Sequence, residues 1–333
     1  MTMLNALVAL TAGIAPMIVY ALIVWWLDRY EKEPWPLLVG VFVWGAVPSI
    51  ILALIIELVL DIPLHSLIGP GLTYNLLGSS LIAPLVEELC KGLAVLAVVI
   101  LFYRQLDGVL DGVVYGSLVG FGFAAVENVL YFLSSLNRGG AGAMFVVIFL
   151  RAFLFGLNHA FFTSLTGIGF AVARASRRWP VKLAAPLVGF ALAVAAHALH
   201  NTGAAFASVT LLGLLVSVAS DWVGIVTILV IILLATFQER GWIAQYLADE
   251  VANGLITPGQ YHAACSYLER AGERTNALLR GDVGRFFRLG RFYQMMTRLA
   301  FRKYQLASFG DEGGNRAEVD RWRRQVAAMK GLV

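Results

Sequence analysis

The stretch GSSLIAPLVEELCKGLAVLAVVILFY, residues 78–103, decides how this chain folds. A helix of this length can cross the hydrocarbon core of a bilayer, because a span needs about 20 mostly apolar residues. The run nevertheless contains two carboxylates and an ammonium group, from Glu87, Glu88 and Lys91. Each ionisable group inside a span costs about 2.5–3.5 kcal/mol on insertion scales, and such groups tend to face the bundle interior and to mark function. The stretch therefore predicts a membrane helix that carries part of a functional site.

The rest of the chain has the same apolar character. Of its 333 residues, 59% are hydrophobic and only 14% are charged, against about 25% charged in a typical soluble domain. The mean hydropathy is +0.77. The apolar runs are long, whereas barrel strands would show short alternating stretches. The sequence therefore predicts an all-α, polytopic helical membrane protein. Its first run starts at Leu4 without a basic segment, so we expect a retained span rather than a cleaved signal peptide.

Seven apolar runs have the length of a transmembrane helix. They cover residues 4–27, 37–60, 78–103, 112–134, 143–173, 181–205 and 208–237. Arg151 suggests that the fifth run enters the lipid only after that residue. Asp221 interrupts the seventh run, which is either one kinked span or two short elements.

Basic residues favour one orientation. Lys and Arg gather in the alternate loops 28–36, 104–111 and 174–182 and in the segment after residue 237. Because cytoplasmic loops carry an excess of Lys and Arg, we expect a multi-pass cell-membrane protein with its N-terminus extracytoplasmic and its C-terminus cytoplasmic.

The chain divides into two predicted domains, a transmembrane catalytic domain at 1–238 and a helical, basic cytoplasmic tail at 239–333. In the tail, Thr257-Pro258-Gly259-Gln260 has the pattern of a helix start with a capping box. The segment from Arg285 to Arg302 alternates aromatic residues with arginines. It is either a basic helix on the anionic inner leaflet or a helix packed in a small bundle. No nucleic-acid-binding motif accompanies the charge, so no nucleic acid partner is expected.

Polar residues of four consecutive predicted helices fall at one depth. Glu87 is about nine residues from the outer end of its run, Glu127 and His159 about seven, and His197 about eight. At 1.5 Å per residue, all four lie roughly 10–14 Å below the outer surface. Groups at one level of neighbouring helices can converge on one cavity.

Spacing along each helix adds detail. Lys91 is three and four residues from Glu88 and Glu87, so it can neutralise one carboxylate and leave the other for chemistry. His197 and Asn201 share a helix face, and His200 either joins them or points elsewhere.

This set of side chains suits amide hydrolysis. A glutamate can take a proton from water, and His and Asn side chains can donate to an oxyanion. Glu and His are also ligands for Zn²⁺, which activates a bound water. The chain has no HExxH motif, which excludes the usual zinc-protease helix. It also has no GxSxG and no Asp pair in facing helices, which counts against serine and aspartic intramembrane proteases.

At these residues the sequence resembles the PrsW family of bacterial intramembrane proteases, which is related to the CAAX prenyl endopeptidases. The resemblance rests on Glu87–Lys91 (EExxK), Phe123–Glu127 (FxxxE), His159, His197–Asn201 (HxxxN) and the loop Asp28–Trp35. It extends from residue 1 to about 238. The order and spacing of these pieces are more specific than any one of them.

The resemblance implies a role for each motif residue. The implied catalytic set is Glu87, Glu88, Lys91, Glu127, His159, His197 and Asn201. Glu87 would activate water with support from Glu88 and Lys91, and His197 with Asn201 would bind the oxyanion. Glu127 and His159 would complete a water or metal site, and the ligands of a Zn²⁺ ion would be Glu127, His159 and His197. Because the prenyl endopeptidases have a His at the position of Glu127, the metal and the glutamate-only mechanisms both stay open.

The resulting hypothesis is an intramembrane endopeptidase that cuts single-span membrane proteins near their extracytoplasmic end. One alternative is a non-catalytic membrane scaffold whose polar cluster binds a partner's helix. Another is a proton- or ion-coupled transporter with a Glu/His relay, which would spread polar residues over both halves of the bilayer. The oligomeric state cannot be read from the sequence.

Overall fold

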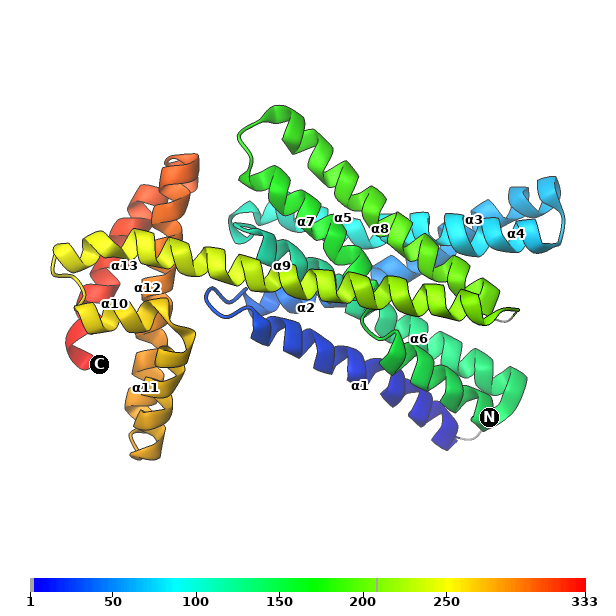
Figure 1. Cartoon of the computed structure of the whole chain (residues 1–333), viewed down its shortest axis with the longest axis horizontal. Helices are drawn as coiled ribbons and strands as arrows, with labels where there is room; N and C mark the ends of the chain where they lie inside the picture. Colours follow the sequence, from blue (N-terminus) through cyan, green and yellow to red (C-terminus); the bar gives the residue numbers. More distant parts are fainter. Residues whose placement is uncertain (1–2, 208) are drawn as a thin grey trace. The chain divides into compact units, whose positions relative to one another are not determined.

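The computed structural model describes residues 3–207 and 209–333, and every regular element in these ranges is a helix. Five helical stretches are long and apolar enough to cross a membrane. The all-α, polytopic class is thereby confirmed. The chain forms two compact units, one of Met1–Leu27 with Glu33–Ile232 and one of Asp28–Lys32 with Leu233–Val333 (Figure 1). We call them the first and the second unit.

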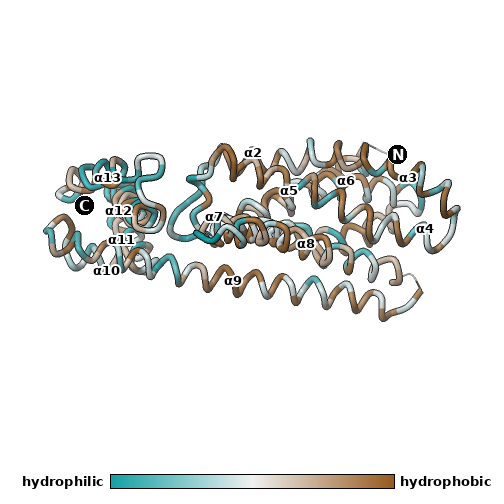
Figure 2. Tube along the Cα trace, turned by 90° about the horizontal axis from the view of Figure 1, so that it is seen from above, coloured by the Kyte–Doolittle hydropathy of each residue, from teal (hydrophilic) through white to brown (hydrophobic). Residues whose placement is uncertain are grey.

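The first unit holds the apolar helices. They are α1 (Met3–Leu27), α2 (Trp35–Trp44), α3 (Ile50–Ile68), α4 (Leu72–Leu77), α5 (Ala83–Leu101), α6 (Val109–Ile148), α7 (Asn158–Ala175), α8 (Trp179–Ala207) and the first part of α9 (Leu211–Ala252). Short π-helical segments, η1 (Gly45–Ser49), η2 (Gly78–Ile82) and η4 (Phe149–Leu154), and the 3₁₀ turn η3 (Tyr103–Gln105) connect them. Figure 2 shows these helices to be hydrophobic along most of their length.

The sequence predicts seven spans, whereas five stretches qualify by length and hydropathy, for two physical reasons. Helix α5 is apolar except for its three charged side chains. The 67-residue stretch Val109–Ala175 counts as one candidate span, although its backbone leaves the helical conformation at Gly140 (φ 72°, ψ −171°). Phe132 and Ile148, on opposite sides of this bend, then share one apolar cluster. Adding α5 and dividing this stretch at Gly140 would give seven apolar helices, and the seven-span assignment stays a prediction.

The last apolar run is one helix. Helix α9 continues without a break from Leu211 to Ala252 and carries Asp221 in its interior. Of the two alternatives for this run, the two-element one is therefore wrong.

Close approach of α6 and α7 positions the site. Gly112, Gly116 and Gly120 recur every four residues on α6, the small-xxx-small pattern of packed membrane helices. A Cβ atom at Gly120 would lie 2.4 Å from the carbonyl oxygen of His159, and one at Gly116 would lie 2.6 Å from that of Thr163. Only glycine lets the two backbones come this close, and the contact sets the height of His159 relative to α6.

The second unit is a small helical bundle. It contains the end of α9 together with α10 (Pro258–Cys265), α11 (Tyr267–Leu279), α12 (Val283–Phe309), η5 (Glu312–Gly314), α13 (Asn315–Met329) and η6 (Lys330–Leu332). The predicted capping box is present, since Thr257 Oγ1 accepts from the Gln260 N–H at 3.2 Å and Gln260 Oε1 accepts from the Thr257 N–H at 2.9 Å. Phe292 and Leu299 of α12 lie in the bundle core, so most of the segment 285–302 is a packed helix, the second of its two predicted alternatives.

Candidate active site

Lys91 is the centre of a buried polar cluster. Its side chain is 0% exposed, and its Nζ atom lies 3.1 Å from Glu87 Oε2 and 2.8 Å from Glu88 Oε1. The same atom lies 3.1 Å from His159 Nδ1 on α7, and it sits over the Phe123 ring. A lysine has three N–H donors, so the three polar neighbours use all of them. The FxxxE phenylalanine thus covers the ammonium group.

Glu88 is held on every side. Its Oε1 also lies 3.1 Å from His197 Nδ1 on α8, and its Oε2 accepts from the Thr163 hydroxyl at 2.9 Å. Glu87 has fewer partners, namely Lys91 and, at 3.8 Å, His197 Nε2. Of the two adjacent carboxylates, Glu88 is therefore held in place by its neighbours, whereas the Glu87 carboxylate can make further contacts on one side.

Glu127 joins the cluster through His159. Its Oε2 lies 2.8 Å from His159 Nε2 and also pairs with the guanidinium group of Arg151. Arg151 Nε in turn donates to Asn128 at 2.9 Å. The sequence interpretation treated Arg151 as a marker of the lipid boundary and missed this contact. A single arginine inside an apolar run was the signal that could have found it, since a buried charge needs a partner.

The hydrogen-bond network assigns the two imidazoles different tautomers. His159 accepts from the Lys91 ammonium at Nδ1, so its Nε2 carries the proton that faces Glu127. His197 faces the Glu88 carboxylate with Nδ1, which makes Nδ1 the donor and leaves the Nε2 lone pair toward Glu87. His197 Nε2 can therefore take a proton or bind an electrophile.

These groups border a cavity of about 800 Å³ in the first unit. Its wall includes Glu87, Glu127, His159 and His197, which come from four different helices. Glu88 and Lys91 lie behind them. A liquid water occupies about 30 Å³, so the cavity has room for water and a peptide segment beside the carboxylates.

Helix α3 supplies two further carboxylates that the sequence interpretation overlooked. Glu57 and Asp61 are four residues apart, and both line the cavity. Asp61 accepts from the Tyr74 hydroxyl. Glu57 lies inside the predicted span 37–60, where any acidic residue is a signal. The apolar lining of the same helix includes Ile50, Leu54 and Leu58.

Asn201 lines the cavity without contacting the cluster. Its Nδ2 donates to the carbonyl oxygen of Ser79 at 2.7 Å. One N–H of the amide is used in this way, and the second remains a donor. The structure thus places Asn201 near the other motif residues, one turn of α8 beyond His197.

His200 also lines the cavity, but its polar contacts form a separate chain. Its Nδ1 lies 2.8 Å from Asp221 Oδ2 on α9, and its Nε2 lies 3.4 Å from Asn158 Nδ2. Asn158 Oδ1 accepts from the backbone N–H of His159 at 2.7 Å. Asp221 is fully buried. This chain of contacts links α9 to the start of α7, where the helix resumes after η4 and a turn.

A metal ion is compatible with the side chains present. One donor atom each from Glu87, His159 and His197 lies within 4.8 Å of the others, and two His with one Glu are a ligand set of catalytic zinc sites. Glu88 at His197 Nδ1 matches the carboxylate–histidine arrangement that orients metal ligands. The sequence-based ligand set has Glu127 where this geometric set has Glu87. A metal on His159 would replace its contact with Lys91 or with Glu127.

The fold and the cluster define a multi-pass helical membrane protein with a carboxylate and imidazole site inside its helix bundle. A family model described as PrsW family intramembrane metalloprotease matches residues 33–236, more than half of the chain. The chain belongs to the PrsW family.

Two curated relatives are similar to parts of the chain. A protein named Protease PrsW from Clostridioides difficile (strain 630) is 32% identical over 107 residues, which are 32% of this chain and 43% of that protein. A protein of the same name from Geobacillus kaustophilus (strain HTA426) is 28% identical over 166 residues, 50% of this chain and 66% of the relative. The matches thus span less than half of one relative and about two thirds of the other. No solved structure matches the chain.

Proposed function

We propose that this protein is an intramembrane endopeptidase, which hydrolyses a peptide bond of a membrane-protein substrate with an activated water. One observation carries the proposal: Glu87, Glu127, His159 and His197 come from four helices and line one cavity with partly apolar walls. The family match and the names of the relatives support it. A scaffold without catalysis would favour a site too narrow for water, and the cavity volume speaks against that alternative.

Glu87 is the proposed base. It has an open side toward the cavity, whereas Glu88 is enclosed by Lys91, His197 and Thr163. Removal of a proton from water by a positioned carboxylate contributes typically about 10²–10⁴-fold to a rate. Lys91 balances the charge of the Glu87/Glu88 pair, and the Glu88 carboxylate fixes the orientation of the His197 ring.

Side chains of α8 would stabilise the oxyanion that forms when water attacks the peptide carbonyl. Glu87 would take a proton from the attacking water and pass it to Nε2 of the neutral His197, whose Nδ1 faces Glu88. Nε2 would then donate a hydrogen bond to the oxyanion. Asn201 lines the same cavity, and the second N–H of its amide is a further donor. Donors fixed in advance at the place where charge develops are usually the largest single contribution to catalysis.

A zinc ion, if bound, would be held by Glu87, His159 and His197 and would act as a Lewis acid that lowers the pKa of a bound water to about 7. In that arrangement Glu127, paired with Arg151, would be the carboxylate that remains beside the water. Elemental analysis of the purified protein and of His197→Ala tests this assignment. Stoichiometric zinc that the variant loses supports it, and a fully active protein without divalent metal contradicts it.

The proposed substrate is a single-span membrane protein cut near the extracytoplasmic side. The positive-inside pattern of the loops supports an extracytoplasmic N-terminus and a cytoplasmic C-terminus in the cell membrane. In this orientation the four cavity residues lie in the outer half of the bilayer. A transporter would carry polar groups through both halves, and the polar wall here gathers around one cavity.

Glu87→Gln tests the proposal in purified protein reconstituted with quenched fluorescent single-span peptides. We expect cleavage to fall at least about 100-fold in a variant that still unfolds cooperatively, because Gln keeps the shape of Glu87 and Lys91 keeps its pairing with Glu88. Glu57→Gln is the matched control, because it makes the same chemical change in the wall of the same cavity, and it should keep most of the activity. Cleavage that persists in folded Glu87→Gln contradicts the role of Glu87 as the base.

A further inference from the structure

The turn between α11 and α12 in the second unit has an unusual composition. The segment 274–291, RTNALLRGDVGRFFRLGR, contains five arginines and a single acidic residue. Helix α11 ends at Leu279, Gly281 adopts a positive φ of 75°, and α12 begins after Asp282, which accepts from the Arg285 N–H at 2.7 Å. The result is a tight helix–turn–helix corner, and we call residues 278–288 the corner.

Large apolar side chains of the corner face outward. Leu279 is 80% exposed, Phe287 59%, Val283 50% and Leu278 49%. Their neighbours Ala277, Leu289 and Phe292 are buried in the core of the bundle, so the exposed side chains are surplus to that core. A group of exposed apolar residues on a folded unit marks a surface that binds a membrane or another protein.

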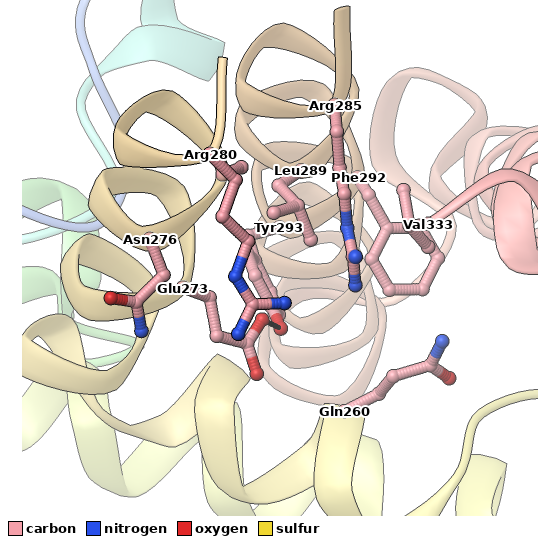
Figure 3. Close-up of a pocket in the computed structure, with 10 residues that line it drawn as sticks. Gln260, Glu273, Asn276, Arg280, Arg285, Leu289, Phe292, Tyr293 and Val333 are labelled. Carbon is pink, nitrogen blue, oxygen red and sulfur yellow. Dashed lines mark hydrogen bonds between the residues drawn. The ribbon is translucent and has the colours of Figure 1, made fainter. Parts of the chain in front are cut away.

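The arginines in and beside the corner differ in their partners. Arg274, just before the corner, lies over the Phe286 ring, and Arg288 is 3.9 Å from Asp282. Among the residues that the structure describes, Arg280 and Arg285 make no ion pair. Both side chains border a cavity of about 280 Å³, and Figure 3 shows their guanidinium groups directed into it.

The rest of the cavity wall suits an anion. Gln260 and Asn276 supply amide groups to the wall. Glu273, the one acidic side chain among the lining residues, already accepts a hydrogen bond from the Tyr293 hydroxyl. Arginine guanidinium groups bind phosphate through pairs of parallel N–H bonds. The wall therefore favours a phosphate-bearing ligand over a cationic one.

We propose that the corner docks on the surface of an anionic bilayer, with Leu278, Leu279, Val283 and Phe287 among the acyl chains. Arg280 and Arg285 would bind lipid phosphate groups. Apolar side chains flanked by basic ones have the chemistry of interfacial membrane anchors. Helix α9, whose end belongs to the second unit, is a candidate membrane span, so the unit is tethered to a bilayer. The inference does not depend on the proposed protease activity.

The experiment uses the full chain in nanodiscs, with Leu279→Cys carrying an environment-sensitive fluorophore. The native Cys90 and Cys265 are buried, so the label reports position 279. We expect blue-shifted emission, and quenching by spin-labelled lipid, in discs that contain phosphatidylserine but not in discs of phosphatidylcholine alone. High salt should reverse the shift, since it screens charges at the surface.

Arg280→Gln combined with Arg285→Gln tests the role of the charges. Each basic residue near an anionic surface is worth about 1 kcal/mol, so the docked-to-undocked ratio should fall about 30-fold. Arg316→Gln with Arg324→Gln is the matched control, because it removes two exposed arginines of α13, and it should leave the ratio unchanged.

Three results would overturn the proposal. The first is a label that stays water-exposed in both kinds of disc. The second is an equal shift in both, which would mean that charge plays no part. The third is a label buried without lipid quenching, which would mean that a protein surface covers the corner.

Discussion

The two units use charged residues in opposite ways. In the first unit Lys91 is fully buried in an apolar helix, while Val59 and Ile62 of α3 are exposed. In the second unit Phe292 is buried, whereas Arg280 and Arg285 are exposed. The difference shows that the medium around each unit, lipid or water, decides where its charged and apolar side chains lie. Lipid leaves apolar side chains outside and drives charges together, whereas water does the reverse.

The largest effect should follow from breaking the buried ion cluster. Lys91→Met leaves the buried carboxylates of Glu87 and Glu88 without their cation, and removing one partner of a buried pair costs about 3–5 kcal/mol. We expect a large drop in thermal stability and loss of cleavage.

Lys303→Met is the comparison in the second unit. Lys303 pairs with Asp249 and Glu250 at a partly exposed place, and Arg323 also contacts Glu250. Its loss should cost about 1 kcal/mol. Equal stability losses in melting experiments on the two variants would contradict the contrast between the units.

Substitutions at the contact between α6 and α7 should have the next largest effect on stability. Gly120→Ala places a Cβ atom 2.4 Å from the carbonyl oxygen of His159, and such overpacking costs about 1–3 kcal/mol. Gly241→Ala on α9 meets no atom within 4 Å and should stabilise by about 0.5–1 kcal/mol, since alanine favours helix. Opposite signs in the melting temperatures are expected, and equal shifts would contradict the close packing of α6 on α7.

The chain of contacts that starts at Asp221 of α9 should affect the rate of cleavage more than the stability of the fold. Asp221→Asn weakens the hold on His200 and, through Asn158, on the start of α7. Loss of such outer contacts typically costs about 10–100-fold in activity or metal affinity. We expect kcat to fall with KM little changed, and Ser217→Ala, which removes only a hydroxyl contact to the His200 carbonyl, to be mild. A variant with normal kcat would show that the chain is structural only.

The smallest effect should be alkaline loss of stability in the second unit. Burial raises the pKa of Tyr30 and of Tyr293 above the ordinary value of 10, and the bond to Glu273 adds to the shift at Tyr293. Because the folded unit holds these hydroxyls neutral, their contribution to stability is present below pH 10 and is lost as the pH rises further. Tyr293→Phe should flatten the decline of the melting temperature above pH 10. An unchanged slope would contradict this cause.

Much of the site could be predicted because helix geometry makes depth readable from sequence. Rise per residue places Glu87, Glu127, His159 and His197 at one level, and the i,i+3 and i,i+4 spacing brings Lys91 to both glutamates. The same reasoning could not find the bond from Arg151 to Glu127 or the one from His200 to Asp221. These contacts depend on how far each helix is rotated about its axis, and depth carries no information on rotation.

The sequence by itself determined the membrane class, the helical fold and the presence of polar residues within apolar helices, because each of these follows from composition along a single helix. Only the tertiary structure decided which atoms meet. It placed His159 against Lys91 through the glycine contact of α6 and α7, left Asn201 on Ser79, and buried α12 in a bundle. The physical reason is that contacts between helices arise from packing of surfaces far apart in the chain, and these surfaces exist only after folding.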